Sequence, residues 1–156
     1  EYSALNDLVV SRGSKIRVVN VEALINGNHF ATYKGDGIVI ATATGSTAYS
    51  LSLGGAILSP SINNMIMKPI AAHTSLMGGL VIEKDVVISL KASSNEDLSI
   101  SVDGFIDNKI EDFDQIDVEI DNENKAFFLR SENFENLYWT SLAQKLDLRK
   151  GDSISG

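Results

Sequence analysis

Short runs of apolar and β-branched residues, separated by turn sequences, recur along most of the chain. They predict strands over the ranges Asp7–Ser11, Ile16–Ile25, Phe30–Lys34, Ile38–Thr42, Leu80–Ile82, Val86–Lys91, Leu98–Asp103, Phe105–Ile110, Ile116–Ile120 and Ala126–Arg130. The dipeptides Asn26-Gly27 and Asp103-Gly104 predict tight hairpin turns. Ile38–Thr42 is short and apolar throughout, so we expect it to be buried on both faces. Many short strands with few helices predict a mainly β, β-sandwich-like domain.

Two segments have a helical pattern instead. Residues 47–54 contain alanine and leucine, which favour helix. We expect Thr44 or Ser46 to cap this helix and Gly54-Gly55 to end it. Near the end of the chain, apolar residues recur at spacings of three and four, which predicts an amphipathic C-terminal helix. These residues are Phe134, Leu137, Tyr138, Leu142 and Leu146.

Composition limits the classes of function. With 156 residues, of which 44% are hydrophobic, the chain is expected to fold as one domain. A net charge of −8 argues against a nucleic-acid partner, which would favour a basic surface. No apolar run approaches the roughly 20 residues of a membrane span. The absence of cysteine excludes disulfides and thiolate metal sites, and is compatible with the cytoplasm. Because the chain begins at Glu1 in mid-pattern, we expect it to be a piece of a longer protein.

The richest candidate for chemistry is the Thr/Gly/Ser cluster that follows Ile38–Thr42. A helix beginning there would leave backbone N–H groups free, beside the hydroxyls of Thr44, Ser46 and Thr47. Tyr49 could stack against a flat heterocycle. Such a corner suits a ligand with phosphate, ribose or amide groups, and an ordinary capped helix is the alternative.

Other candidates are weaker. Asp36, between two glycines, could accept hydrogen bonds from an amide or a ribose hydroxyl, although Gly-Asp-Gly is also a good turn sequence. Two histidines, His29 and His73, are too few for a histidine metal cluster. The G-x-S-x-G, G-x-G-x-x-G and Walker A motifs are absent, which disfavours a hydrolase and a Rossmann-type dinucleotide site.

The combination of motifs resembles the NAD kinase family over essentially the whole chain. The matching stretches are Ala4–Asp7, Gly35–Gly37, Thr42–Ser50, Leu51–Pro60, Pro69–Thr74, Ser101–Gly104 and Leu142–Leu146. The T-G-S-T-A-Y sequence at 44–49, with its flanks, is the specific part of this pattern. The resemblance implies a β-sandwich-like C-terminal domain of the NAD kinase/diacylglycerol kinase type. Residues 1–156 would form the NAD-binding domain, and an α/β N-terminal domain with a G-G-D-G motif would be missing from this chain.

The resemblance also implies an activity. NAD kinases transfer a phosphoryl group from ATP or polyphosphate to the 2′-hydroxyl of the adenosine ribose of NAD, which gives NADP, with Mg²⁺ or another divalent metal. NAD and ATP are thus the implied partners, and a homodimer or homotetramer in the cytoplasm is implied. The expected catalytic aspartate belongs to the missing domain. We therefore expect no catalytic residue and no metal ligand in this chain, and no activity from this chain alone.

The NAD site implied by the resemblance consists of Asn6, Asp7, Asp36, Thr47, Ala48, Tyr49 and Ser52. The pair at 6–7 matches an N-E/D motif that holds the adenosine end, and residues 47–49 match the lining of the NAD site, with Tyr49 near the nicotinamide. Asp36 matches an aspartate that receives the nicotinamide carboxamide, often from a neighbouring subunit. Ser52 matches a serine in the same pocket.

Three positions depart from the family pattern. Position 43 is alanine instead of the usual proline, position 7 is aspartate instead of the commoner glutamate, and Gly78-Gly79 stands where many members have Arg-Pro. The last change removes a basic group and leaves an alternative open: a catalytically lapsed module that binds dinucleotide or only oligomerises. Diacylglycerol and sphingosine kinases share the two-domain plan but lack the T-G-S-T-A-Y arrangement, so they rank lower.

Overall fold

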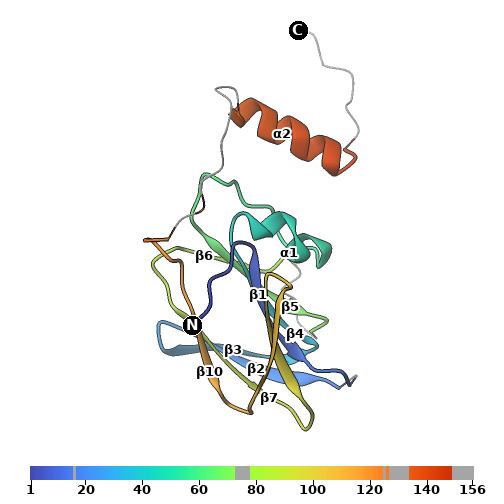
Figure 1. The fold of residues 1–156 in the computed structure, drawn as a ribbon, viewed down its shortest axis with the longest axis vertical. Coiled ribbons are helices and arrows are strands. Elements are labelled where there is room, and N and C mark those ends of the chain that lie inside the picture. The colour runs from blue at the N-terminus through green and yellow to red at the C-terminus, as the bar shows by residue number, and fades with distance from the viewer. Residues whose placement is uncertain (16, 73–77, 125, 127–133, 149–156) are drawn as a thin grey trace. The chain divides into compact units, whose positions relative to one another are not determined.

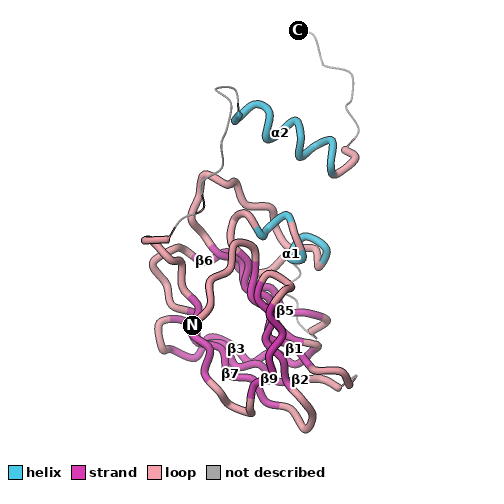
Figure 2. The backbone as a smooth tube through the Cα atoms, viewed as in Figure 1, coloured by secondary structure: helices cyan, strands magenta, loops and turns pink. Residues whose placement is uncertain are grey.

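The structure is a computed structural model that describes residues 1–15, 17–72, 78–124, 126 and 134–148. The chain divides into two units, residues 1–123 and 124–156, which are considered separately. In the described part of the first unit, ten strands form two sheets whose neighbouring strands are all antiparallel (Figures 1 and 2). The prediction of a mainly β, sandwich-like domain is confirmed.

The two sheets have different sizes. In spatial order, the six-stranded sheet contains β6 (Leu80–Ile82), β5 (Met65–Ile70), β4 (Gly37–Ala41), β1 (Asp7–Arg12), β8 (Leu98–Val102) and β9 (Ile106–Ile110). The four-stranded sheet contains β10 (Gln115–Val118), β7 (Ile88–Ser93), β2 (Val19–Ile25) and β3 (Asn28–Gly35). Most strands begin or end within two or three residues of the predicted ranges, and the largest difference is at β2, which begins at Val19 rather than at Ile16.

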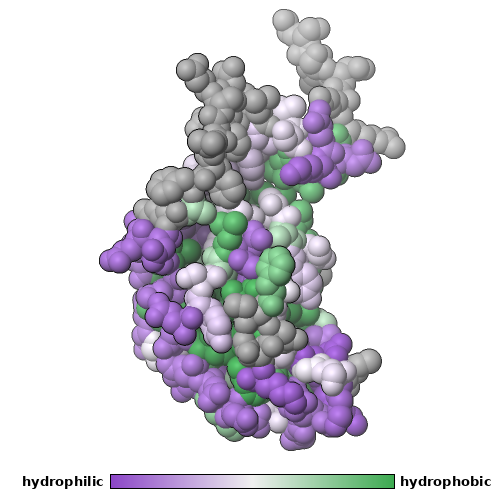
Figure 3. Space-filling model, in the orientation of Figure 1, coloured by the Kyte–Doolittle hydropathy of each residue, from purple (hydrophilic) through white to green (hydrophobic). Residues whose placement is uncertain are grey.

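One hydrophobic core joins the two sheets. Alternate residues of the strands face it, as in β2, where Val19, Val21 and Ala23 are buried while Asn20 between them is exposed. The buried members of this core are Val10, Val19, Val21, Ala23, Tyr33, Ile38, Ile40, Met65, Met67, Ile82, Val86, Ile88, Leu90, Ala92 and Leu98. Polar residues cover most of the lower part of the unit in the view of Figure 3.

The strands β4 and β5 are buried on both faces, as was predicted for the apolar run that became β4. In β5, Met65 and Met67 face the main core, while Ile66 belongs to a second cluster with Ala43 and Leu58. This second cluster packs the segment after β4 against the sheet and so fixes the place where the Thr/Gly/Ser cluster leaves it.

Strand β5, which contains Pro69, was not predicted. A central strand is hydrogen-bonded to a neighbour on each side, and proline lacks the N–H group that one of these bonds requires. Here β6 pairs with Met65–Met67, while β4 pairs with Ile66–Ile70. At Pro69 the strand therefore has one partner only, and a proline can be accommodated.

Both predicted hairpin turns are confirmed. Asn26 and Gly27 have φ angles of 49° and 75°, and Asp103 and Gly104 have φ angles of 50° and 71°. Two consecutive positive φ angles are typical of a type I′ turn, which suits the twist of a two-stranded hairpin. The second turn joins β8 to β9 and places Asp103 at the end of β8.

The predicted helix after β4 is shorter than expected. It consists of a 3₁₀ turn at Gly45–Thr47 and one α-helical turn, α1 (Tyr49–Ser52). The Gly54-Gly55 ending is confirmed: Gly54 N–H donates to Leu51 O (2.8 Å), Gly55 N–H donates to Ser50 O (2.9 Å), and Gly54 has φ +78°.

The second unit contains the predicted C-terminal helix, α2 (Phe134–Lys145). Its apolar residues segregate only weakly to one side, so the prediction of an amphipathic helix was too strong. The strand predicted at 126–130 lies outside the described residues, apart from Ala126. Within the described residues, no helix is both long and apolar enough to cross a membrane.

Candidate functional site

The segment before β1 meets the segment after β4, and Thr42 joins them. Thr42 N–H donates to Asn6 O (2.9 Å), and Thr42 Oγ1 donates to Leu5 O (2.7 Å). The same Oγ1 accepts a hydrogen bond from Gly45 N–H (3.0 Å). One threonine thus connects the Asn6-Asp7 pair with the start of the 3₁₀ turn.

Gly45 allows these two segments to approach closely. A Cβ atom at this position would overlap the carbonyl oxygen of Asn6. The glycine in T-G-S-T-A-Y is therefore required by backbone packing inside the protein, in addition to any approach of a ligand.

A third segment completes the arrangement through Asp103. Its carboxylate accepts hydrogen bonds from three consecutive backbone N–H groups: Leu5 N to Oδ2 (2.7 Å), Asn6 N to Oδ1 (2.7 Å) and Asp7 N to Oδ1 (3.0 Å). In return, Asp103 N–H donates to Asp7 O (2.9 Å). Hydrogen bonds to an ionised carboxylate are stronger than those between neutral groups, so the β8–β9 turn holds residues 5–7 firmly.

Asp7 is a buried carboxyl group at this corner, with a side chain that is 7% exposed. Burial, and to a lesser extent the neighbouring Asp103 carboxylate, raise the pKa of Asp7 above its ordinary value. Within the part of the chain that the structure describes, no hydrogen-bond donor contacts the Asp7 carboxylate. A ligand hydroxyl or amide would give this carboxylate the donor that it lacks.

The prediction of free amides at the helix start is wrong for residues 45–48. Gly45 N–H bonds to Thr42 Oγ1, Ser46 N–H to Thr42 O (2.8 Å) and Ala48 N–H to Gly45 O (2.9 Å). A 3₁₀ turn uses these donors within itself, and α1 has only four residues. Anion binding by a helix N-terminus therefore does not apply at this corner.

The predicted capping residues also need correction. Thr44 has helical backbone angles (φ −63°, ψ −48°) and makes no capping hydrogen bond. Ser46 is fully buried, with its hydroxyl donating to Ala43 O (2.6 Å) and accepting from Leu58 N–H (3.0 Å). The capping role belongs to Thr42, and Ser46 ties the turn to the second apolar cluster.

The groups that remain available lie on the outer side of the corner. Thr47 and Ser52 are exposed, Ala48 is half-buried, and the Tyr49 side chain is 43% exposed. Asn6 is half-buried at the adjoining segment. Six of the seven predicted site residues thus belong to the segments that converge here, and the seventh is Asp36. Ser46, a hydroxyl expected to face the ligand, lies in the same turn but is buried.

Asp36 lies elsewhere. It separates β3 from β4, and its carboxylate pairs with Arg12, with 3.2 Å between Oδ1 and Nε. Both side chains remain partly exposed, at 39% for Asp36 and 28% for Arg12, so the second carboxylate oxygen can serve another donor.

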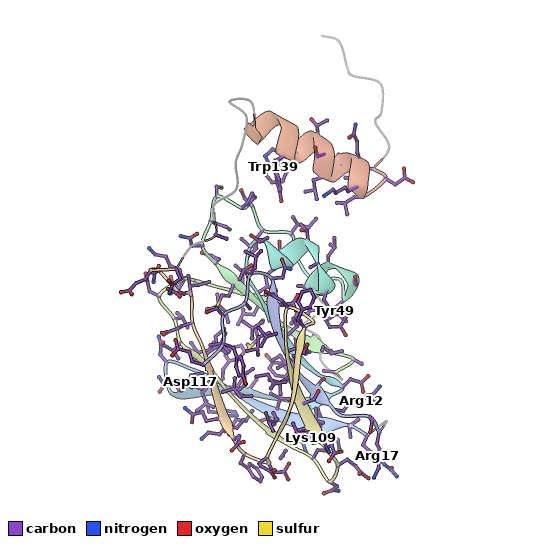
Figure 4. All side chains as sticks on the ribbon, viewed as in Figure 1. Arg12, Arg17, Tyr49, Lys109, Asp117 and Trp139 are labelled. Carbon is purple, nitrogen blue, oxygen red and sulfur yellow. The ribbon has the colours of Figure 1, made fainter. Side chains whose placement is uncertain are left out.

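Strand β4 separates Asp36 from the corner at Thr42–Tyr49. Five residues in a strand span on the order of 17 Å. Figure 4 shows the same separation, with Tyr49 beside α1 and Arg12, the partner of Asp36, farther along the sandwich. Within one chain, the length of β4 therefore lies between Asp36 and the segment that contains Tyr49.

The described residues do not offer a metal site. Among residues 1–15, 17–72, 78–124, 126 and 134–148, no group of three or more His, Cys, Asp or Glu side chains could hold a metal ion. The residues present therefore do not fit a divalent ion, and no step is assigned to a metal in this chain. His73 lies outside the described residues.

Sequence reasoning missed two residues that organise the corner, Thr42 and Asp103. Asp103 was predicted to lie in a hairpin turn and Thr42 to end a strand, and neither was assigned a role in the site. A sequence signal for Asp103 existed, because S-V-D-G is among the stretches that resemble the NAD kinase family. Its contact with residues 5–7 gave no such signal, because almost 100 positions separate Asp103 from them.

Comparison with known proteins identifies the family of this chain. Residues 5–130 match the family described as ATP-NAD kinase C-terminal domain. The NAD kinase of Caldanaerobacter subterraneus subsp. tengcongensis is 39% identical over 146 residues, which are 92% of this chain and 52% of that protein. The NAD kinase of Dehalococcoides mccartyi is 36% identical over 156 residues, which are 99% of this chain and 53% of that protein. The chain spans about half the length of these relatives.

Solved structures share the fold. Yeast NADH kinase, in a crystal structure with NADH, superposes with a TM-score of 0.76 and 28% identity, over 98% of this chain and 44% of that one. An NAD kinase from Archaeoglobus fulgidus, in a complex with ATP, superposes with a TM-score of 0.75 at 24% identity, over 90% of this chain and 54% of that one. The fold is therefore that of the kinases of nicotinamide dinucleotides. On the family match, the chain belongs to the ATP-NAD kinase C-terminal domain family.

Proposed function

We propose that this chain is the dinucleotide-binding half of an NAD kinase, which phosphorylates the 2′-hydroxyl of the adenosine ribose of NAD to give NADP. The observation that carries the proposal is the convergence of Asn6-Asp7 with the T-G-S-T-A-Y turn, joined by Thr42 and Asp103. Membership of the kinase family and the similarity to yeast NADH kinase, which was crystallised with NADH, support the choice of ligand.

The residues of the corner have chemistry that suits NAD. Asn6 and the carboxylate of Asp7 would hold the adenosine end, because they offer an amide and an acceptor without a donor of its own. Tyr49 would present its exposed ring to the nicotinamide side, with Thr47, Ala48 and Ser52 beside it. Together they would fix the orientation of the ribose, which is the main contribution that a protein makes to phosphoryl transfer.

Asp36 would act on the dinucleotide of a neighbouring subunit. Its second carboxylate oxygen would accept a hydrogen bond from the carboxamide NH₂ of the nicotinamide. The length of β4 between Asp36 and Tyr49 supports this assignment, since a homodimer or homotetramer could bring Asp36 of one copy to the Tyr49 side of another.

The donor half of the reaction would lie outside this chain. The 2′-hydroxyl oxygen would attack the terminal phosphorus of ATP or polyphosphate, the bond to the leaving phosphate would break, and the hydroxyl proton would pass to a base. We assign that base, the divalent metal and the donor phosphates to an upstream α/β domain with a G-G-D-G motif. A location in the cytoplasm belongs to the same proposal.

A kinase assay tests the proposal. The full-length protein, supplied with NAD, ATP and Mg²⁺, should form NADP, and residues 1–156 alone should form none. NADP formation by residues 1–156 would contradict the assignment of the base to an upstream domain. No NADP formation by a folded full-length protein would contradict the kinase assignment.

Gly78-Gly79 supports a second candidate, a lapsed dinucleotide-binding or assembly module, because a basic group is absent from this loop. Calorimetry with NAD separates the two candidates. A full-length protein that binds NAD and does not turn it over would favour the lapsed module.

A further inference from the structure

The β8–β9 turn contributes a residue that the site described so far does not include. Asp103 lies almost 100 positions from residues 5–7, yet its two carboxylate oxygens accept the N–H groups of Leu5, Asn6 and Asp7 at 2.7–3.0 Å. We infer that Asp103 is a positioning residue, which sets the place of Asn6 and Asp7 and thereby the affinity for the adenosine end of the dinucleotide. This inference rests on the proposed function.

The contact is built to hold a fixed geometry. Residues 5–7 lie between the Asp103 carboxylate on one side and Thr42 on the other, where Thr42 binds the carbonyl oxygens of Leu5 and Asn6. The three N–H groups of this segment donate to the Asp103 carboxylate, while the carbonyl oxygens of Leu5 and Asn6 accept from Thr42, so the two residues fix different backbone groups. If the hydrogen bonds to Asp103 or those to Thr42 are lost, residues 5–7 can rotate, and their side chains move relative to the T-G-S-T-A-Y turn.

The backbone of Asp103 does not itself require a carboxylate. Its φ angle of 50° belongs to the first position of a type I′ turn, which asparagine and glycine adopt at least as readily. The other type I′ turn of the unit uses asparagine at the same position: Asn26 has φ 49°, and its Oδ1 accepts a hydrogen bond from Val87 N–H (3.0 Å). The charge at 103 is therefore explained by the amides that it binds, not by the turn.

These two turns offer a matched pair of variants. Asp103→Gly and Asn26→Gly each keep a residue that accepts positive φ, and each remove a side-chain acceptor from backbone N–H groups. They differ in place, since only Asp103 contacts the Asn6-Asp7 segment. A loss of stability should be common to both, and a loss of dinucleotide affinity should be specific to Asp103.

The experiment is steady-state kinetics of the full-length protein, with the KM for NAD, the KM for ATP and kcat measured separately for wild type and variants. Asp103→Gly should raise the KM for NAD by about tenfold or more, because three hydrogen bonds to a charged group are lost, with a smaller change in the KM for ATP. Asn26→Gly should leave both KM values within about twofold of wild type.

A merely structural role gives a different result. A smaller folded fraction lowers the apparent kcat and leaves both KM values unchanged. Asp103→Gly with an unchanged KM for NAD, or an equal rise with Asn26→Gly, would overturn the inference. If Asp103→Gly does not fold, Asp103→Asn takes its place: it keeps Oδ1, which binds two of the three amides, and should raise the KM for NAD by a smaller factor. An unchanged KM for this variant would overturn the inference too.

The proposed function and this inference fail in different ways. A folded wild type that forms no NADP from NAD and ATP would overturn the proposed function before any variant is compared. An active wild type whose KM for NAD does not respond to Asp103 would overturn only the positioning role.

Discussion

At the scale of single residues, the Asp7 carboxylate has opposite effects on the stability of the protein and on its proposed binding of NAD. Asp7 is buried beside Asp103, without a donor among the described residues, and its pKa is raised by burial first and by Asp103 second. A carboxyl group with a raised pKa in the folded state favours the protonated form there, so its contribution to stability is full below the ordinary pKa and is lost as pH rises through the folded value. The ionised form of Asp7 therefore lowers the free energy of unfolding at neutral pH.

Asp7→Asn should therefore stabilise the protein at pH 7, by up to about 1 kcal/mol, because it removes a desolvated charge and keeps the shape. The difference should shrink as the pH is lowered from 7 to about 4, because a carboxyl group with a raised pKa becomes increasingly protonated over this range. Urea unfolding at both pH values measures this effect. NAD affinity should fall in the same variant, and a variant that is less stable than wild type at pH 7 would show that the carboxylate is satisfied in the folded protein.

Asp36 is a second residue with a separable role. Asp36→Ala should weaken NAD binding by about 1–3 kcal/mol, because the carboxamide donor would lose its partner. The same substitution breaks the ion pair with Arg12, which, as a partly exposed pair, contributes little to stability.

Arg12→Ala is the control for Asp36, since it breaks the same ion pair and keeps the carboxylate. It should change NAD affinity by less than about 0.5 kcal/mol. Calorimetry of both variants decides the matter: equal losses would mean that the ion pair, and not the Asp36 carboxylate, supports binding.

At the scale of elements, the 3₁₀ turn depends on its contact with the segment before β1. Gly45→Ala should destabilise the protein by about 2 kcal/mol or more, because the new Cβ would overlap the carbonyl oxygen of Asn6. A Cβ at Gly78 would meet nothing within 4 Å, so Gly78→Ala should change stability by less than about 0.5 kcal/mol. Denaturant midpoints of the two variants test this, and similar values would show that the approach of Gly45 to Asn6 is not needed.

The elements differ in how far sequence could predict them. The strands with β-branched residues and the two type I′ turns were predictable, since local pattern and turn chemistry decide them. Strand β5 was not, because Pro69 is acceptable only where β6 has already ended, and that is a property of the sheet. The helix start was predicted with free amides, while the structure uses those amides within a 3₁₀ turn.

The same limit applies to the site. Motif resemblance brought Asn6, Asp7 and the residues at 47–52 together, and the structure places their segments side by side. The connection by Thr42 and Asp103 could not be read from spacing, because it depends on β4, β1 and β8 being neighbours in the six-stranded sheet.

At the scale of the whole molecule, the length of β4 has a consequence for assembly. If Asp36 and Tyr49 serve one dinucleotide from different subunits, each variant alone should lose activity, and mixing them should restore some. In a homodimer, random exchange gives half heterodimers, each with one intact site, so about a quarter of wild-type activity should return.

Refolding the two full-length variants, Asp36→Ala and Tyr49→Ala, together and then measuring NADP formation tests this prediction. The control is the same mixture without subunit exchange. No recovery after exchange would place both residues in the same subunit's site, in conflict with the separation along β4.

The central claim is that the corner formed by residues 5–7, 42–49 and 103 binds the dinucleotide. An NMR titration of the isotope-labelled full-length protein with NAD tests it most directly, without requiring turnover. The backbone amides of Asn6, Asp7, Thr47 and Tyr49 should shift in a saturable way, while those of the Asn26-Gly27 turn, which belongs to the other sheet, should not. A saturable binding curve with no shift at the corner, or no binding at all, would contradict the claim.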